Sequence, residues 1–484
     1  MATRWAQAAM DRLNSRLAQQ ALDPATVRAH PERAILVGVE VRQGSREPNT
    51  DAPGAAALPL EDSLAELALL ANTAGAEVVG TLVQRLNRPY PATYIGPGKV
   101  AELGEFLSAE QADLAIFDLN LSPTQQRNLG ERLRRRVVDR TALILDIFAQ
   151  RAQTREGQLQ VELAQLEYLR PRLSQIWEEW SRLGGAEAGT GGARGGRIAT
   201  RGPGETQLET DRRSIGRRIA ELKKKIAAIS SQRGLYRSRR KAAGPPIVAL
   251  VGYTNAGKST LLHALTNADV LREDKLFATL DPTTRRVQLP GGQAILLTDT
   301  VGFIQRLPTN VIAAFRATLE EVDEADVLVH VVDATHPNMR EQIATVGHTL
   351  NALHISAKPM ITALNKLDRL PPATRRTLTA SAAQSAAGAK EDETSDQFGE
   401  LPNPVPISAV HGDGLDDLLQ AIQTTIAAED QVQLRVRIPY RLGRLVQLFH
   451  TSGTVEDEQY EAQGTVITGT VPERLAATFQ PYQL

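Results

Sequence analysis

The sequence predicts an α/β protein of several domains, in which the central domain is a mostly parallel sheet with helices on both faces. Apolar strand-like runs alternate with segments of helical spacing along much of the chain. One of these runs, residues 247–251, leads through a glycine-rich turn directly into a helix. The 484 residues leave room for roughly three domains, and a hydrophobic fraction of 42% can supply sizeable cores.

The first domain is expected at residues 33–147, as a small α/β unit. Residues 34–41 form an apolar strand, and residues 78–83 and 114–119 have the composition of further strands, with helical segments between and after them. Residues 1–32 are polar and rich in alanine and arginine, and we expect a loosely ordered extension or a single helix there.

The sequence predicts the local structure of two segments in this domain. Residues 63–72 have helical spacing, with Ser63 as the predicted N-cap and Glu66 completing a capping box three residues later. Residues 94–99 read Tyr-Ile-Gly-Pro-Gly-Lys. Such a piece could approach a phosphate, but a tight turn is the more common structure. We therefore predict a turn at residues 94–99.

Residues 148–243 are predicted to form an antiparallel helical hairpin. Two sets of apolar residues each follow alternating steps of four and three, with Arg170 and Arg233 in the vacant positions, so each set lines one side of a helix. Each seam is too short to stand alone and pairs most economically with the other. Residues 184–204 between them are too rich in glycine to be helical and form a Gly/Arg-rich tip loop. The first seam holds Leu159, Leu163, Leu166, Leu173, Trp177 and Trp180, and the second holds Ile215, Ile219, Leu222, Ile226, Ile229 and Tyr236.

The central domain is expected at residues 244–429, followed by a small C-terminal α+β domain at residues 430–484. Within the central domain, residues 380–402 are rich in serine and alanine and then acidic, which predicts a disordered insertion. In the C-terminal domain, residues 432–438 alternate between apolar and polar side chains, which is typical of a strand.

The composition excludes several classes of protein. The chain has no cysteine, which excludes disulfides, thiolate metal sites and cysteine nucleophiles. No run approaches 18 uncharged apolar residues, so no membrane span is expected, and the N-terminal sequence lacks the apolar core of a secretory signal. Together these features favour the cytoplasm. The net charge of −1 says little about partners, because the charges are unevenly distributed.

The strongest chemical signal is the phosphate-binding loop at residues 252–259, Gly-Tyr-Thr-Asn-Ala-Gly-Lys-Ser. Its glycines let backbone N–H groups wrap around nucleotide phosphates, and the following helix adds the positive end of its dipole. Lys258 is expected to reach the β- and γ-phosphates. The Ser259 hydroxyl is placed to hold Mg²⁺.

A threonine after this loop is expected to close on Mg²⁺ and the γ-phosphate, which would make residues 276–285 a nucleotide-sensitive switch. The residues themselves do not decide which threonine does so. Thr279, Thr283 and Thr284 all fit.

The next strand, residues 294–298, ends in Asp299-Thr-Val-Gly302. Asp299 can hold Mg²⁺ through water, and Gly302 can offer its N–H to the γ-phosphate. Many GTPases place a glutamine directly after this glycine to orient the attacking water, but here the residue is Phe303. We therefore predict slow intrinsic turnover, with the water positioned by backbone, a partner or an ion.

The base-reading element is residues 365–368, Asn-Lys-Leu-Asp. Asp368 can accept hydrogen bonds from guanine N1–H and N2–H₂, a pair of donors that adenine lacks, and rejection works because a buried carboxylate without donors is costly. Asn365 can bond N7 and the loop backbone, and the stem of Lys366 can lie on the ring face. Residues 408–410, Ser-Ala-Val, suit a loop whose backbone contacts guanine O6. These motifs, in this order, predict a guanine-nucleotide-binding domain.

The second arm of the hairpin carries a local excess of basic residues in a nearly neutral chain. Beside an Arg/Gly-rich loop, such an excess points to binding of an RNA phosphate backbone, although a solvated helix face is the simpler alternative. The acids on this arm are Glu205, Glu209, Asp211 and Glu221, and the basic residues are Arg212, Arg213, Arg217, Arg218, Lys223, Lys224, Lys225, Arg237, Arg239, Arg240 and Lys241.

Taken together, these motifs resemble the HflX family, ribosome-associated GTPases related to the Obg group. The resemblance covers nearly the whole chain from about residue 33 and is far more specific than generic GTPase motifs. The segments that carry it are residues 94–99 (YIGPGK), 139–148 (DRTALILDIF), 160–165 (QVELAQ), 201–205 (RGPGE), 252–259 (GYTNAGKS), 276–283 (LFATLDPT) and 299–303 (DTVGF).

The resemblance implies an N-terminal domain unique to the family, a helical linker, a P-loop GTPase domain and a small C-terminal domain. It also implies binding to ribosomal RNA of the large ribosomal subunit, and a role in splitting or rescuing stalled ribosomes under stress or in ribosome biogenesis. Some members are thought to bind ATP through the N-terminal region. An alternative is therefore an ATP-driven RNA-remodelling enzyme with the GTPase as its regulator. We expect a monomer, although the sequence leaves the oligomeric state open.

By analogy with Obg-like proteins, Thr279 is the first choice for the switch ligand of Mg²⁺ and Thr283 the second. Asn255 is at a position that resembles potassium-assisted GTPases, so K⁺ is a further candidate cofactor beside Mg²⁺ and the substrate GTP. The expected catalytic residues are Lys258, Thr279 and Gly302, and the expected metal ligands are Ser259, Thr279 and Asp299. The residues expected to contact the nucleotide are Gly252, Tyr253, Thr254, Asn255, Ala256, Gly257, Lys258, Ser259, Thr260, Phe277, Ala278, Thr279, Leu280, Asp281, Asp299, Thr300, Val301, Gly302, Asn365, Lys366, Leu367, Asp368, Ser408, Ala409 and Val410.

Overall fold

The computed structural model forms two compact units, each described here by itself. The first unit comprises Met1–Ile229, Asp274–Asp281 and Gln305–Ala317, and the second comprises Ser230–Glu273, Pro282–Ile304 and Thr318–Leu484. The residues that the structure describes are 31–41, 59–173, 203–241, 245–266, 276–277, 279–305, 321–353, 355, 358–386, 401–429, 431–452 and 454–484. The predicted N-terminal extension therefore lies almost wholly outside the described residues.

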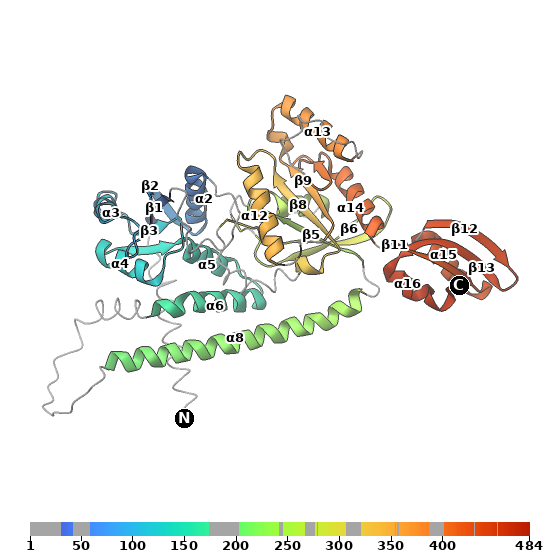
Figure 1. The fold of residues 1–484 in the computed structure, drawn as a ribbon, viewed down its shortest axis with the longest axis horizontal. Coiled ribbons are helices and arrows are strands. Elements are labelled where there is room, and N and C mark those ends of the chain that lie inside the picture. Colours follow the sequence, from blue (N-terminus) through green and yellow to red (C-terminus); the bar gives the residue numbers. More distant parts are fainter. Residues whose placement is uncertain are drawn as a thin grey trace. The chain divides into compact units, whose positions relative to one another are not determined.

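The N-terminal domain is a four-stranded parallel sheet with helices around it, as the alternating pattern predicts (Figure 1). The strand order β2-β1-β3-β4 places the first strand inside the sheet, where its central residues are buried. The strands are β1 (Glu32–Val41), β2 (Ala76–Leu86), β3 (Leu114–Phe117) and β4 (Arg136–Asp139), and the helices are α2 (Leu60–Thr73), α3 (Pro97–Ala109), α4 (Pro123–Leu133) and α5 (Arg140–Arg151).

The capping box predicted at Ser63 and Glu66 is wrong. Helix α2 already begins at Leu60, so Ser63 lies inside it, and its hydroxyl donates to the carboxylate of Asp118. Glu66 forms an ion pair with Arg140, whose guanidinium also donates to Asp118 over 2.6 Å. The Arg140 side chain is fully buried. A buried guanidinium is stable only when it is paired, so tertiary contacts use the side chains that a local motif would otherwise occupy.

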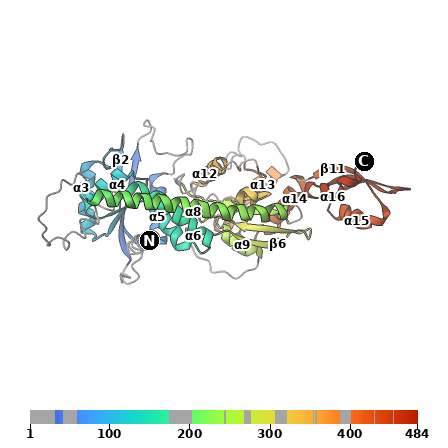
Figure 2. The same ribbon diagram turned by 90° about the horizontal axis from the view of Figure 1, so that it is seen from below.

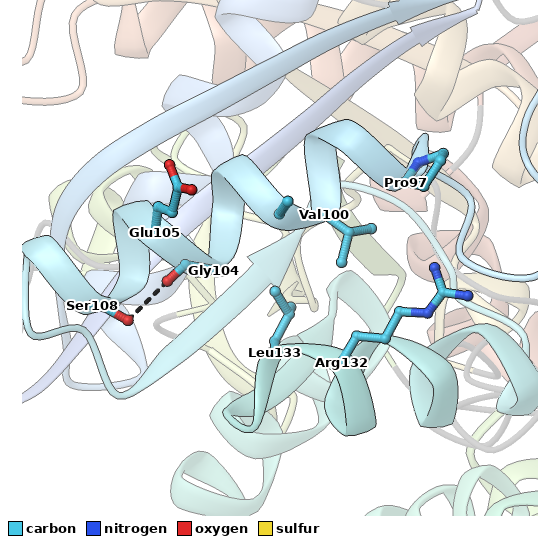
Figure 3. A pocket seen from close by; sticks show the side chains of 8 residues that line it. Pro97, Val100, Gly104, Glu105, Ser108, Arg132 and Leu133 are labelled. Carbon is cyan, nitrogen blue, oxygen red and sulfur yellow. Dashed lines mark hydrogen bonds between the residues drawn. The ribbon is translucent and has the colours of Figure 1, made fainter.

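The turn predicted at residues 94–99 is confirmed for residues 94–96 and wrong for residues 97–99, which form the first turn of α3. Tyr94 has a φ of +62° and pairs with Tyr90 in a short bridge. Gly96 is the N-cap of α3, and Pro97 occupies its first turn, where the missing N–H has no cost. An open groove lies between α3 and α4, and Figure 3 shows Arg132 facing the side of α3 that carries Pro97. The groove is lined by Pro97, Val100, Ala101, Gly104, Glu105, Ser108, Arg132 and Leu133.

The helical hairpin is confirmed by a shared apolar cluster. Helix α6 (Arg155–Leu169), extended by a short 3₁₀ turn (Arg170–Arg172), lies beside the long helix α8 (Pro203–Lys241) (Figures 1 and 2). Ion pairs Arg218–Glu162 and Lys223–Glu167 flank the seam. Residues 184–202 of the predicted tip loop, Trp177, Trp180 and the side chains of Arg233 and Tyr236 lie outside the described residues. The prediction that residues 184–204 are not helical is wrong for its last two residues, because α8 begins at Pro203. The cluster comprises Leu163, Leu166, Leu173, Ile215, Ile219 and Leu222, with Leu159 and Ile226 packed against it.

The nucleotide domain has a six-stranded sheet in the order β10-β9-β8-β5-β7-β6, parallel except for the edge strand β6. One apolar cluster joins the sheet to α9 and α14, and another joins it to α12 and α13, so helices cover both faces as predicted. The strands are β5 (Ile247–Gly252), β6 (Thr283–Gln288), β7 (Ala294–Asp299), β8 (Val327–Asp333), β9 (Met360–Asn365) and β10 (Pro404–Pro406), and the helices are α9 (Lys258–Thr266), α12 (Met339–Ala352), α13 (Pro372–Ala386) and α14 (Leu415–Glu429).

The disordered insertion predicted at residues 380–402 is wrong for its first part. Helix α13 continues to Ala386, and Ala382 is buried. Alanine is the best helix former, so the run of alanines extends the helix rather than ending it. Residues 387–400, which include most of the acidic stretch, lie outside the described residues.

The C-terminal domain is a small α+β unit, as predicted. Its antiparallel sheet has the order β11-β13-β12, and Phe449 and Phe479 pack edge to face in its core with ring centroids 5.1 Å apart. None of the helices in the described ranges is both long and apolar enough to cross a membrane. The elements are β11 (Gln431–Ile438), α15 (Gly443–Ser452), β12 (Thr454–Glu461), β13 (Gly464–Pro472) and α16 (Glu473–Phe479).

Candidate nucleotide-binding site

The phosphate-binding loop joins β5 to α9 in the second unit, and two of its glycines are required by its shape. Gly252 has a φ of +152°, and a Cβ there would overlap the carbonyl oxygen of Val331 on the neighbouring strand. Gly257 has a φ of +100°, and a Cβ there would overlap the side-chain amide of Asn365. Only glycine adopts such conformations without strain. The loop is therefore packed closely against both the sheet and the base-reading element.

Lys258 is buried beneath the loop. Its Nζ donates to the backbone carbonyls of Gly252 over 3.1 Å and Tyr253 over 2.9 Å. Burial lowers the pKa of Lys258 to about 8, and the nearby carboxylate of Asp299 only partly opposes this shift. His330, on β8, is also buried, and desolvation together with the charge of Lys258 lowers its pKa to about 4. Lys258 thus lies beside a neutral histidine, and a cation at this end of the site favours an anionic ligand.

Two of the predicted metal ligands lie together. The Ser259 hydroxyl donates to Oδ2 of Asp299 over 2.7 Å. Thr283, the first residue of β6, lies opposite Asp299 in the antiparallel ladder between β6 and β7. A hydroxyl and a carboxylate are hard oxygen donors of the kind that Mg²⁺ prefers. These residues therefore fit a magnesium ion bound together with the nucleotide.

The chain after Asp299 pairs with the phosphate loop. The N–H of Phe303 donates to the carbonyl of Gly252 over 3.0 Å, and the N–H of Thr254 donates to the carbonyl of Phe303 over 2.8 Å. A Cβ at Gly302 would lie 2.9 Å from Cα of Thr254 and 3.0 Å from Nζ of Lys258, so glycine permits this close approach. The ring of Phe303 is buried, and an apolar ring cannot orient a water molecule. The structure thus contains the arrangement from which slow turnover was predicted.

The base-reading residues connect three loops. Asn365, at the end of β9, donates from Nδ2 to the carbonyl of Ala256 over 2.9 Å and accepts the N–H of Ala409 over 3.0 Å. The Asp368 carboxylate accepts a hydrogen bond of 2.7 Å from the hydroxyl of Ser408, which is fully buried. The phosphate loop and the two loops predicted to read guanine therefore come together around one site.

Asp333 is a site residue that the sequence analysis missed. It ends β8, and its Oδ2 accepts a hydrogen bond of 2.6 Å from Nζ of Lys366. Thr335 donates to its other oxygen through the backbone N–H over 2.9 Å and the hydroxyl over 2.6 Å. Burial alone would raise the pKa of Asp333, but the hydrogen bonds from Lys366 and Thr335 outweigh burial and lower it. An acid at the carboxyl end of an apolar strand was the signal that could have revealed it.

Known proteins match this chain over most of its length. Three family models match, described as GTP-binding GTPase N-terminal over residues 61–149, GTP-binding GTPase Middle Region over 151–240, and 50S ribosome-binding GTPase over 247–366. A GTPase HflX from Caldanaerobacter subterraneus is 45% identical over 86% of this chain and 90% of its own length. The GTPase HflX of Escherichia coli K12 is 40% identical over 84% of this chain and 88% of its own length.

The chain belongs to the HflX family of GTPases. The resemblance stated from the motifs is therefore confirmed. A solved structure of a GTP-binding protein from Sulfolobus solfataricus in complex with GDP is also similar, with 22% identity, a TM-score of 0.41, and coverage of 81% of this chain and 98% of that chain.

Part of the segment that the HflX resemblance assigned to the nucleotide is engaged in the first unit. Phe277 packs edge to face against Phe148 with ring centroids 4.7 Å apart, and the Asp281 carboxylate accepts hydrogen bonds at the start of α6. These two side chains therefore belong to the first unit. Thr279 is half-buried in the same segment, and its role as a Mg²⁺ ligand remains a prediction, while Ala278 lies outside the described residues.

The predicted potassium site rests on Asn255 alone. This residue is exposed and has a φ of +60°, the left-handed conformation that asparagine tolerates better than most residues. Its conformation is compatible with the sharp turn of the phosphate loop. Binding of K⁺ remains a prediction.

Ion pairs offset part of the positive charge on the basic arm of the hairpin. Four of its basic residues pair with acids, in the contacts Arg213–Glu209, Arg218–Glu162, Lys223–Glu167 and Lys225–Glu221. Exposed ion pairs reduce the net field that a helix presents to a polyanion. The exposed side chains of Arg212, Arg217 and Lys224 form no ion pair within the described part of the chain. The side chains of residues 232–241 lie outside it.

Proposed function

We propose that this chain is a slow GTPase whose turnover rises when it binds the large ribosomal subunit, and that it splits or rescues stalled ribosomes or acts in their biogenesis. The observation that carries the nucleotide part is the bridge made by Asn365. Its side chain joins the phosphate loop at Ala256 to the guanine-side loop at Ala409, within hydrogen-bond distance of each. Recognition of the phosphates and recognition of the base therefore both depend on the position of the Asn365 side chain.

Guanine is the base that this site favours. Asp368 is held by Ser408 through one of its oxygens, which orients the carboxylate toward the base without neutralising it. Guanine N1–H and N2–H₂ supply two donors to such a carboxylate, whereas adenine offers none in that place. Asp368 is half-buried in the structure, and a bound base would cover it. Because a covered carboxylate that receives no donors from the base is destabilising, adenine nucleotides are rejected.

Mg²⁺ would be held by Ser259, by Asp299 through water, and by one threonine of the switch segment. When bound, it supplies charge neutralisation between the β- and γ-phosphates. Lys258 contributes the remaining positive charge, and the backbone N–H of Gly302 is available to the γ-phosphate. Because Phe303 cannot orient the attacking water, the wild-type protein alone turns over slowly.

Binding to the large subunit is supported by two features. The matching family model is described as a 50S ribosome-binding GTPase. The second arm of the hairpin leaves basic side chains exposed, and a stretch rich in arginine and glycine precedes this arm in the sequence. Phosphate backbones attract such a surface with a strong dependence on salt. Ribosomal RNA is therefore the partner that we propose for the hairpin.

The decisive experiment is GTP turnover with and without purified large subunits. We expect the rate to rise with added subunits, and an unchanged rate would refute stimulation by the ribosome. A chain that lacks residues 185–201 is then compared with wild type in co-sedimentation at several salt concentrations. Unchanged binding with an unchanged salt slope would show that the tip loop does not contact RNA.

A further inference from the structure

Asp281, among the described residues just before β6, holds its part of the chain in the first unit through its carboxylate. Oδ2 of Asp281 accepts the backbone N–H groups of Gln153 and Thr154, each over 2.8 Å. Oδ1 of Asp281 accepts the hydroxyl of Thr154 over 2.5 Å. Thr154 is itself the N-cap of α6. The carboxylate therefore sits at the N-terminus of that helix, where an anion is stabilised by the helix dipole.

Apolar burial reinforces this anchor. Leu276, Phe277 and Leu280 are each at most 5% exposed. Phe277 adopts a φ of +54°, a left-handed conformation that is strained for an aromatic residue. Such strain persists only when the surroundings determine the position of the residue, and here the ring of Phe148 packs against it. Leu276, Phe277 and Leu280 thus have specific packed positions in the first unit.

A glycine in α6 makes room for the anchor. Gly157 lies in the first turn of the helix, and a Cβ there would overlap Oδ1 of Asp281. Its backbone φ is not in the left-handed region, so the conformation does not itself require glycine. The space at this position is therefore occupied by the carboxylate, and even a methyl group would displace it.

We propose that Asp281 is a positioning residue for GTP, which holds the switch segment ordered before the nucleotide binds. This proposal rests on the proposed function. Asp281 is two residues from Thr279 and two residues from Thr283, the two candidates for the Mg²⁺ ligand. Ordering a loop on binding costs conformational entropy, and a segment that is already ordered avoids that cost. The benefit applies to GTP, because GDP has no γ-phosphate for the switch to contact.

The test compares affinities for GDP and for a non-hydrolysable GTP analogue, both with Mg²⁺. In Asp281→Ala, we expect the affinity for the analogue to fall about tenfold relative to GDP, a change of about 1.4 kcal/mol. Gly157→Ala should lower the ratio of analogue affinity to GDP affinity in the same way, although the residue at position 281 is still aspartate. Asp281→Asn retains an oxygen acceptor and suits a helix N-terminus, so it should largely restore the wild-type ratio.

Ser122→Ala is the matched control, since Ser122 caps α4 in the same unit and does not touch the switch segment. It should reduce thermal stability without changing the ratio. The proposal is overturned if Asp281→Ala and Gly157→Ala both leave the ratio of analogue affinity to GDP affinity unchanged. The Asp281 carboxylate would then only stabilise the N-terminus of α6. A rise in the ratio would overturn it as well, since the anchor would then compete with GTP. Failure of the wild type to bind guanine nucleotides would instead refute the proposed function.

Discussion

Replacement of Asp333 by asparagine should weaken the binding of every purine nucleotide by the same factor. Asp333 holds Nζ of Lys366 at 2.6 Å, and Lys366 lies in a left-handed turn with a φ of +68°. That geometry fixes the lysine stem, which we expect to lie on the face of the base. The contact with the ring face does not depend on the groups that distinguish guanine from hypoxanthine.

The magnitude follows from the burial of the pair. The side chains of Lys366 and Asp333 are 15% and 13% exposed, so the pair is mostly but not fully buried. Breaking a fully buried ion pair costs about 3–5 kcal/mol, whereas an exposed pair contributes about 0–1 kcal/mol. The flexible stem lets Lys366 turn toward water. Nucleotide binding loses only the part of this contribution that holds the lysine stem against the base. We therefore expect a loss of about 1–2 kcal/mol in binding free energy, which is about 5- to 30-fold in affinity.

The assay is a titration of GDP and inosine diphosphate with wild type and Asp333→Asn. Both affinities should fall while their ratio stays constant. Asp413→Asn is the matched control, because it removes an exposed pair with Arg375 in the same domain, and it should change neither affinity by more than about twofold. An unchanged GDP affinity in Asp333→Asn, or a loss confined to GDP, would refute this role of Asp333.

The dependence on pH provides a second check on Asp333. Its pKa in the folded protein is lowered, so the stabilisation from the charged carboxylate is fully present above the ordinary pKa of 3.8. It is lost only as the pH falls through the lowered value. Titration of Asp333 should therefore cause no change in the affinity of the wild type for GDP between about pH 5 and pH 8.

Three further predictions test other parts of the structure. Gly257→Ala should weaken nucleotide binding about tenfold or more, because it strains a φ of +100° and displaces Asn365, and titration with GDP would measure this. Nucleotide phosphates should raise the lowered pKa of Lys258 back toward its ordinary value. Nucleotide binding near pH 8–9 should therefore take up protons, and the affinity should weaken as the pH rises. Calorimetry in buffers of different ionisation enthalpy would detect the proton uptake. Arg140→Met should destabilise the first unit by about 3–5 kcal/mol in urea unfolding and leave GDP binding unchanged; a loss below about 1 kcal/mol would contradict the structural role of the buried ion pairs.

The sequence by itself determined the nucleotide domain, its motifs and their order. Each motif follows a strand directly, and the carboxyl ends of parallel strands meet at one edge of a sheet. For that reason Ser259 and Asp299 could be placed together without coordinates, and the same holds for Asn365 and the loop at Ala409. The heptad spacing likewise predicted that the two helical seams pack on each other.

Only the tertiary structure decided which partner a side chain binds when several partners are possible. Ser63 and Glu66 fit a local capping box, but the buried guanidinium of Arg140 and its partner Asp118 engage both of them. The Asp281 carboxylate likewise lies at the N-terminus of α6, far from it in sequence. A short motif predicts only contacts between residues that are close in sequence. A buried charge must instead be paired with whichever group the fold brings near it.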